Sequence, residues 1–181
     1  MSAQGPVRAT DKENTKLDWE TPRPLFVWRN SIWKFDIDAA ANATNSLLGD
    51  RYFGPGSNHM KDANVPLANW TAFGHSFFSN PEYGRGIMNW LEQYYRQSRK
   101  GALIECLIPA NTGTRWFSYC KEKAASIELL TGRVGFWYDG KPLPPKEDRN
   151  TSDSMLVQWR RGAEGAAIFV TDWKKEMVKY E

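Results

Sequence analysis

The segment ALIECLIPA, residues 102–110, is almost continuously apolar. A strand that is buried on both faces has this composition, and such strands are typical of parallel sheets covered by helices on both sides. Helical patterns of apolar residues stand directly before and after it, and shorter strand patterns lie beyond them. Strand, helix, strand, helix and strand therefore follow one another, which predicts an α/β fold with a mostly parallel sheet and right-handed crossovers.

Each of these elements has a local signature. The first helix is expected at residues 21–33, where Thr21 can cap the start and Pro22 suits the first turn. The other expected strands are residues 34–38, 75–80 and 126–132, and the other expected helices are residues 85–101 and 114–125.

The last third of the chain has strand patterns without helices between them. Residues 134–141, 154–159 and 166–173 are expected to be antiparallel strands on the edge of the parallel sheet, with a C-terminal antiparallel hairpin. A long, charged, proline-containing loop joins the first two of these strands. Long loops in compact domains are usually functional or disordered.

Length, charge and cysteine content limit the class of protein. The 181 residues fit a flexible polar arm at residues 1–17 and a single domain at residues 18–181. The net charge of +3 permits a polyanionic partner without requiring one. No signal peptide or membrane-spanning run is recognisable, so we expect a soluble, cytoplasmic protein. Cys106 and Cys120 form no C-x-x-C pattern, so no metal site is expected.

Aromatic residues are abundant, with nine Trp, nine Phe and seven Tyr. Most of them are expected to form an aromatic-rich core, because such side chains dominate the energetics of cores. A few have an alternative use, which is to stack on a planar ligand such as a nucleobase.

The segment SFFSNPEYG, residues 76–84, ends an apolar strand in Asn80-Pro81, and Glu82 and Tyr83 follow. Ligands of open α/β sheets bind beyond the carboxyl ends of the strands, so this tetrapeptide stands where a ligand is expected. The alternative is a plain strand-to-helix turn, in which Asn80 caps the helix and Pro81 lies in its first turn.

Five linked motifs carry a resemblance to a known family. They are DWETP, FDIDAAANATN, SFFSNPEYG, LIPANTGTRWF and LLTGRVGFW. Their order and spacing, over about residues 18–160, resemble the phage-type DNA adenine N6-methyltransferases. The resemblance implies the Rossmann-like fold of S-adenosylmethionine-dependent methyltransferases, S-adenosylmethionine as methyl donor and double-stranded DNA as partner. For a phage protein, the compartment would be the cytoplasm of the host cell.

The resemblance also implies roles for the tetrapeptide. The side-chain oxygen of Asn80 and the carbonyl oxygen of Pro81 would accept hydrogen bonds from the N6 amine of adenine, which concentrates its lone pair. The ring of Tyr83 would stack on a base swung out of the duplex. Much of the catalysis would then be positioning and electrostatics, without a metal. Methylation of cytosine N4, whose amine poses the same problem, is an alternative that the motif leaves open.

Glu82 departs from the family pattern, which usually has a second proline at this position. A carboxylate here is harmless if it points to solvent or caps the following helix. It is also a candidate for an extra acceptor on the substrate amine. A third alternative is that it repels DNA phosphates, which would make this chain an inactive, DNA-binding relative.

The resemblance assigns further residues to the cofactor. Thr21 and Pro22 resemble the N-terminal cofactor motif, and Asp38 resembles the acidic residue that takes the cofactor's ammonium or ribose hydroxyls. Asn80 and Pro109 would border the same pocket. The familiar glycine-rich loop is missing after Asp38, for which the alternative role is a helix cap.

The positively charged residues near the motifs are the DNA-binding candidates. They are Arg85, Arg115, Arg133, Lys141, Lys146 and Arg149. Cations in such places can follow phosphates, although any one of them can simply be a solvated surface residue. Specificity for the DNA sequence is expected in the loop around residues 139–153 and in residues 50–75. Separately, Asp62 or Asn64 would serve the adenine or ribose of the cofactor.

Overall fold

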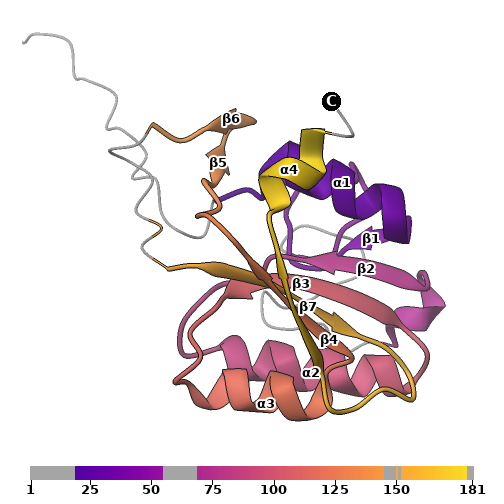
Figure 1. Cartoon of the computed structure of the whole chain (residues 1–181). Helices are drawn as coiled ribbons and strands as arrows, with labels where there is room; N and C mark the ends of the chain where they lie inside the picture. Colours follow the sequence, from indigo (N-terminus) through magenta and orange to yellow (C-terminus); the bar gives the residue numbers. More distant parts are fainter. Residues whose placement is uncertain (1–18, 55–68, 145–149, 151, 179–181) are drawn as a thin grey trace, which may run out of the picture.

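The computed structural model describes residues 19–54, 69–144, 150 and 152–178. Six strands form one sheet in the order β1-β2-β3-β7-β4-β8, and two more form a separate hairpin, β5-β6 (Figure 1). The strands are β1 (Ile37–Asp38), β2 (Ser76–Ser79), β3 (Leu103–Pro109), β4 (Ser126–Leu130), β5 (Trp137–Tyr138), β6 (Lys141–Pro142), β7 (Ser154–Trp159) and β8 (Ala167–Thr171). The helices are α1 (Arg23–Trp33), η2 (Trp70–Ala72), α2 (Ile87–Arg99), α3 (Arg115–Lys123) and α4 (Trp173–Met177).

The sheet is mostly parallel, as the sequence predicts. Strands β1, β2 and β3 pair in parallel, and so do β4 and β8. Strand β7 runs antiparallel to both of its neighbours, β3 and β4. The expected edge position of this strand is therefore wrong, because all six of its residues are buried in the middle of the sheet. Strand β8 does lie at the edge, but it is parallel.

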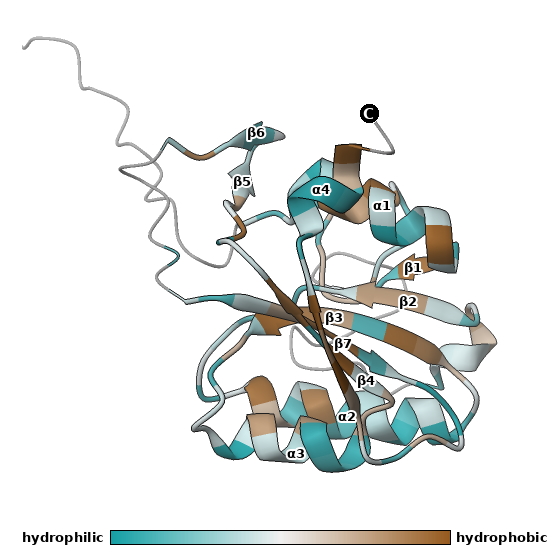
Figure 2. Cartoon of the chain, in the orientation of Figure 1, coloured by the Kyte–Doolittle hydropathy of each residue, from teal (hydrophilic) through white to brown (hydrophobic). Residues whose placement is uncertain are grey.

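Helices cover the two faces of the sheet in separate pairs. Helices α2 and α3 lie together on one face, and α1 and α4 lie on the other (Figure 1). The hydropathy colouring places the brown, apolar stretches on the strands between these layers (Figure 2). None of the described helices is both long and apolar enough to cross a membrane.

Aromatic side chains fill much of the core, which confirms the main prediction for them. Phe53, Trp70, Phe77 and Tyr94 are each at most 1% exposed and form one cluster under α2. Trp70 contacts the other three, with ring centroids 5.0 to 6.0 Å apart. Such contacts stabilise a core beyond the area that they bury.

Helix α1 starts one residue later than a Thr21 cap would require. Pro22 occupies the cap position, and it provides no side-chain hydrogen bond to the first turn. The predicted capping role of Thr21 is therefore wrong. Leu25 and Trp28 are buried in the core, whereas Ile32 is 45% exposed.

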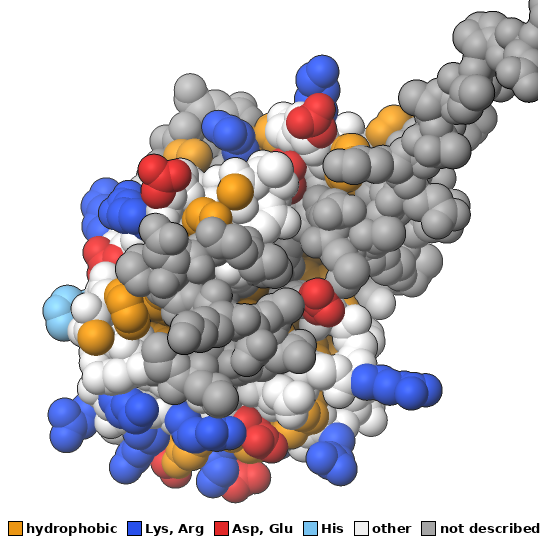
Figure 3. All heavy atoms as spheres, turned by 180° about the vertical axis from the view of Figure 1, so that it is seen from behind, with side chains coloured by type: hydrophobic (Ala, Val, Ile, Leu, Met, Phe, Trp, Pro, Cys, Tyr) orange, Lys and Arg blue, Asp and Glu red, His pale blue; other side chains and the backbone are white. Residues whose placement is uncertain are grey.

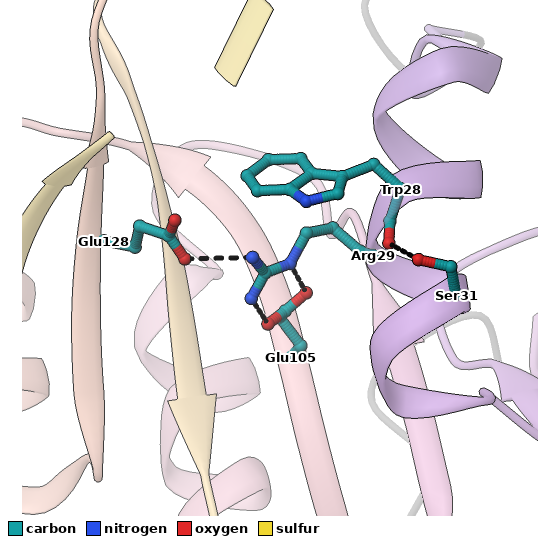
Figure 4. Close-up of polar contacts among 5 residues, drawn as sticks. All are labelled: Trp28, Arg29, Ser31, Glu105 and Glu128. Carbon is teal, nitrogen blue, oxygen red and sulfur yellow. Dashed lines mark hydrogen bonds and ion pairs between the residues drawn. The ribbon is translucent and has the colours of Figure 1, made fainter. Parts of the chain in front are cut away.

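Helix α1 is held to the sheet by a buried group of charges. Arg29 donates from Nε and Nη2 to the two carboxylate oxygens of Glu105 on β3, at 2.8 and 2.5 Å. Its Nη1 lies 3.1 Å from Oε2 of Glu128 on β4 (Figure 4). The guanidinium also lies 4.7 Å from the ring centre of Trp28. Arg29 therefore links α1 to two strands that β7 separates.

We expect Arg29→Met to lower the free energy of unfolding by about 3–5 kcal/mol, because it leaves the buried carboxylate of Glu105 without its partner. Denaturation in urea measures this. The double variant Arg29→Met/Glu105→Gln is the control, and it should lose less because it removes the unpaired charge. A loss below about 1 kcal/mol for the single variant would contradict a structural role for the ion pair.

Candidate active site

Two predicted site residues lie at the same edge of the sheet. Asp38 ends β1, Asn80 directly follows β2, and these strands are parallel neighbours in which Asp38 pairs with Phe78. The N–H of Ala39 extends the pairing by donating to the carbonyl of Phe78 at 2.7 Å. The carboxyl ends of parallel strands meet at one edge, and this is where open α/β sheets bind ligands.

Pro109, the third predicted residue of this edge, is the last residue of β3 and is half-buried. Strand β3 is the next neighbour of β2 in the sheet. The carboxyl ends of β1, β2 and β3 therefore lie side by side in the structure.

The Asn80 tetrapeptide forms an irregular loop between β2 and α2. Helix α2 begins only at Ile87, with Gly86 in the cap position. Asn80 therefore caps no helix, and the plain-turn alternative is wrong. Pro81 is buried, whereas Glu82 is exposed and lies too far from the helix start to cap it.

Tyr83 turns its hydroxyl inward and leaves part of its ring open. The hydroxyl donates to Oδ1 of Asn80 at 2.7 Å and lies 3.3 Å from the carbonyl oxygen of Leu107. Burial of the hydroxyl raises the pKa of Tyr83. The residue is nevertheless 37% exposed, so the ring has a free surface while its hydroxyl is fixed.

A row of aromatic rings connects this loop to the start of the described chain. The ring of Phe136 lies 6.2 Å from Tyr83 on one side and stacks on Trp19 at 5.4 Å on the other. Glu20 and Trp137 exchange backbone hydrogen bonds of 2.8 and 2.9 Å. These contacts place the residues before α1 beside the hairpin and the Asn80 loop.

Thr21 is the next residue, and its hydroxyl has no partner among the residues that the structure describes. The side chain is 3% exposed, and Oγ1 forms no hydrogen bond within the described ranges. A buried hydroxyl without a partner costs free energy, so such a group needs an explanation. A ligand oxygen or nitrogen that enters here would satisfy it.

Asp38 is 4% exposed and accepts a hydrogen bond from the N–H of Leu47 at 3.2 Å. Burial raises the pKa of its carboxyl to about 6, and backbone hydrogen bonds only partly oppose this. No helix starts between residues 39 and 54, so the alternative of a helix cap is wrong. Asn42 and Asn45 bond to the backbone of their own turn.

Comparison with known proteins is consistent with this geometry. The family model described as DNA N-6-adenine-methyltransferase (Dam) matches residues 8–180. The chain belongs to the Dam family. A DNA N-6-adenine-methyltransferase of Escherichia phage T1 is 26% identical over 110 residues, which are 60% of this chain and 42% of that protein. The chain thus spans about two fifths of the relative's length, and no solved structure matches.

The predicted α/β fold and the resemblance to this family are both confirmed. The candidate site brings an amide, a partly open ring and a buried carboxylate to one edge of the sheet. Among the described residues, no three His, Cys, Asp or Glu side chains form a group that could hold a metal ion.

The predicted DNA-binding cations occupy several places. Arg85 lies in the Asn80 loop, Arg115 begins α3, Arg133 follows β4 and Lys141 begins β6, and all four are exposed. Lys146, Arg149, Asp62 and Asn64 lie outside the described residues, and so does the predicted arm at residues 1–17.

A second group of cations, not named from the sequence, lies near α2 and α3. Seen from behind, Lys and Arg side chains gather along the lower edge of the molecule, near α2 and α3 (Figure 3). Both helices carry basic residues in their last turns, namely Arg96, Arg99, Lys121 and Lys123. Cations stabilise the C-terminal ends of helices, and three of these four also pair with glutamates.

The candidate site includes contacts that sequence reasoning missed. The stacking of Trp19 on Phe136 and the pairing of Glu20 with the hairpin were not predicted. One local signal was available, because Asp139-Gly140 is a typical turn dipeptide for a two-residue hairpin. Both residues have positive φ, 49° and 70°, and the N–H of Gly140 donates to the Glu20 carboxylate.

Gly54 packs closely against the segment that follows Asp38, so a side chain at this position should destabilise the fold. A Cβ at Gly54 would lie 1.6 Å from the carbonyl oxygen of Ala41, which is backbone and cannot turn away. We expect Gly54→Ala to lower the free energy of unfolding by about 1–3 kcal/mol or more. Gly113→Ala is the matched control, since nothing lies within 4 Å of its added Cβ. Equal thermal stability of the two variants would contradict the close approach.

Proposed function

We propose that this chain transfers a methyl group from S-adenosylmethionine to the N6 amine of adenine in a short duplex DNA sequence. The observation that carries the proposal is the loop after β2, where Asn80 and the partly open ring of Tyr83 lie at the same edge of the sheet as the buried Asp38. Membership of the Dam family supports the choice of adenine N6 over cytosine N4.

The chemistry requires acceptors, and the loop offers them. The lone pair of the N6 amine is delocalised into the adenine ring, so hydrogen-bond acceptors on its two hydrogens must localise it. Oδ1 of Asn80 accepts one hydrogen bond from Tyr83, and a carbonyl oxygen has a second lone pair for the amine. The carbonyl oxygen of Pro81 is the proposed second acceptor. Preorganised groups of this kind give the largest catalytic contributions when water is excluded.

The described residues fit the cofactor in two respects. The hydroxyl of Thr21 is buried without a partner in the described ranges, next to Pro22, and the carboxylate of Asp38 is buried at the end of β1. Asp38 would hold the cofactor's ammonium or ribose hydroxyls, and Thr21 its methionine part. S-adenosylmethionine, when bound, supplies the electrophilic methyl group. Asn80 and Pro109 would border the same pocket.

DNA is the proposed partner, and the target base would be swung out to stack on Tyr83. The cations that would contact its phosphates are the exposed Arg85, Arg115, Arg133 and Lys141, together with Lys146 and Arg149. The hairpin β5-β6, with the loop that follows it, would contribute to sequence specificity. Such an activity belongs where DNA lies, which is the cytoplasm of a bacterial host cell.

Glu82 is compatible with an active enzyme because its side chain is exposed. If the enzyme is active, the carboxylate of Glu82 takes the place of the usual proline and does not contact the substrate amine. The rival reading, an inactive DNA-binding relative, predicts that Glu82→Pro restores an activity that the natural sequence lacks.

The test of the proposed function is labelled methyl transfer. Purified protein is incubated with unmethylated duplex DNA and methyl-labelled S-adenosylmethionine, and the nucleosides are analysed by mass spectrometry. We expect label in N6-methyladenine and a loss of about 10²- to 10³-fold in Asn80→Ala, which removes an acceptor. Label in N4-methylcytosine would contradict the proposed base. Label that appears only in Glu82→Pro would support the inactive reading.

Substitutions of Tyr83 separate its ring from its hydroxyl. Stacking on a base is worth about 1–3 kcal/mol, so Tyr83→Ala should lower kcat/KM by about 5- to 150-fold. Tyr83→Phe keeps the ring and should lose much less. The measurement is steady-state methylation of DNA. If Tyr83→Phe were as inactive as Tyr83→Ala, the hydroxyl rather than the ring would be the essential group.

Cofactor affinity should depend on pH through Asp38. The carboxyl has a raised pKa of about 6, and only its ionised form attracts an ammonium group. The Kd for S-adenosylmethionine should therefore increase as the pH falls from about 7 through about 6, by up to about tenfold per pH unit. Isothermal titration calorimetry measures it. Asp38→Asn is the control, with weaker and pH-independent binding, and a flat profile for the natural protein would refute the role.

A further inference from the structure

The backbone pairing between β2 and β3 cannot continue into the loop that carries Asn80. The N–H of Leu103 donates to the carbonyl of His75 at 2.8 Å, and in a parallel pair such bonds recur at every second residue of β3. By this pattern the carbonyl of Leu107 would need the N–H of Pro81, and proline has none. Side chains must therefore fix the loop where the backbone ladder stops.

One such side-chain contact lies directly before Asn80. Ser79 is the last residue of β2, and Tyr94 lies in the middle of α2, which covers one face of the sheet (Figure 1). Their hydroxyl oxygens are 2.6 Å apart, so the two residues share a hydrogen bond. This bond joins the strand before the loop to the helix after it.

A second contact holds the loop further along the chain. The hydroxyl of Tyr83 donates to Oδ1 of Asn80 at 2.7 Å and lies 3.3 Å from the carbonyl oxygen of Leu107. That carbonyl is the group to which Pro81 offers no N–H. The Asn80 amide therefore lies between two anchors, with Tyr83 on one side and the end of β2 on the other.

The hydrogen bond between Tyr94 and Ser79 is not needed to fill the core. The ring of Tyr94 packs against Trp70, Trp90 and Trp159, with ring centroids 5.9 to 6.2 Å apart. Burying two hydroxyls beside such rings costs free energy, which their shared bond offsets. Replacing both partners by apolar groups of similar shape can be nearly neutral, so packing alone does not explain the pair.

The position of the pair explains it better. Ser79 and Tyr94 are both 0% exposed, so neither side chain reaches DNA or a cofactor. Burial raises the pKa of Tyr94 well above its ordinary value, and Tyr83 and Asp38 raise it further, so the hydroxyl keeps its proton beneath the site. Any effect of the pair on a reaction must therefore pass through the loop that begins at Asn80.

We propose that Tyr94 is a positioning residue for methyl transfer, an inference that rests on the proposed function. Its hydroxyl holds Ser79, and Ser79 fixes the point at which the chain leaves β2. The direction of Oδ1 of Asn80 and of the Pro81 carbonyl toward the substrate amine is set at this point. Catalysis by positioned acceptors is sensitive to small displacements, so the bond acts on the reaction without touching the substrate.

The test is steady-state methyl transfer by Tyr94→Phe, which keeps the ring, and by Ser79→Ala. We expect each variant to lower kcat by about tenfold, with KM for DNA and for S-adenosylmethionine within about twofold of the natural values. The double variant should be no slower than either single variant, because the two hydroxyls form one bond. Circular dichroism shows whether each variant is folded at the assay temperature.

Helix α2 supplies matched controls. Tyr95→Phe removes a hydroxyl that donates to Glu164 at 2.7 Å, and Ser98→Ala removes a buried hydroxyl that donates to a carbonyl within the helix. Both control variants should keep the natural kcat. Folded Tyr94→Phe and Ser79→Ala with unchanged kcat, or equal losses in the controls, would overturn the proposal. Additive losses in the double variant would also contradict it.

NMR of the Asn80 side-chain amide tests the positioning independently of activity. The signals of this amide are identified by their absence in Asn80→Ala. Tyr94→Phe should shift or broaden them, and Tyr95→Phe should leave them unchanged. Unchanged signals in a folded Tyr94→Phe would refute the positioning role. If the natural protein transferred no methyl group, the proposed function would fail, and these signals would still decide whether Tyr94 positions Asn80.

Discussion

The ion pair between Arg29 and Glu105 is the interaction on which the arrangement of the site depends. Helix α1 precedes all strands of the sheet in the sequence. It is therefore not a crossover between two strands, and other contacts must hold it against the sheet. The bidentate contact to Glu105, and the further contact to Glu128, hold it over the centre of the sheet. Two carboxylates in the core would be unfavourable without this cation, so the helix and the strands need each other. The docked helix in turn fixes the residues before it, including Thr21.

The second constraint is the parallel direction of β1, β2 and β3. Parallel neighbours end at the same edge, so the side chains of Asp38 and Asn80, which are far apart in the sequence, reach one site. The aromatic row of Trp19, Phe136 and Tyr83 closes this site from the side of the hairpin. A carboxylate from the end of β1 thus meets an amide and a ring from the loop after β2. Their combined arrangement, more than any single residue, supports methyl transfer to an amine.

Local patterns predicted the buried central strand, the two helices beside it and the position of Asn80, because periodicity and turn chemistry act over a few residues. Three features were missed or wrong, and the first two depend on distant contacts. Strand β7 enters the middle of the sheet, which requires pairing with β3 and β4 far along the chain. Glu105 looks like an exception in an apolar strand, and its partner is 76 residues away. Thr21 resembles a cap, but Pro22 takes that position and leaves the hydroxyl without a partner among the described residues.

The most direct test of the account is a crystal structure with S-adenosylhomocysteine, the product of the proposed cofactor. The account predicts that the ligand lies beyond the ends of β1 and β2. One of its polar atoms should bond to Oγ1 of Thr21, and its ammonium or ribose should meet the carboxylate of Asp38. A ligand bound at another part of the chain, or a Thr21 hydroxyl still without a partner in the complex, would contradict it.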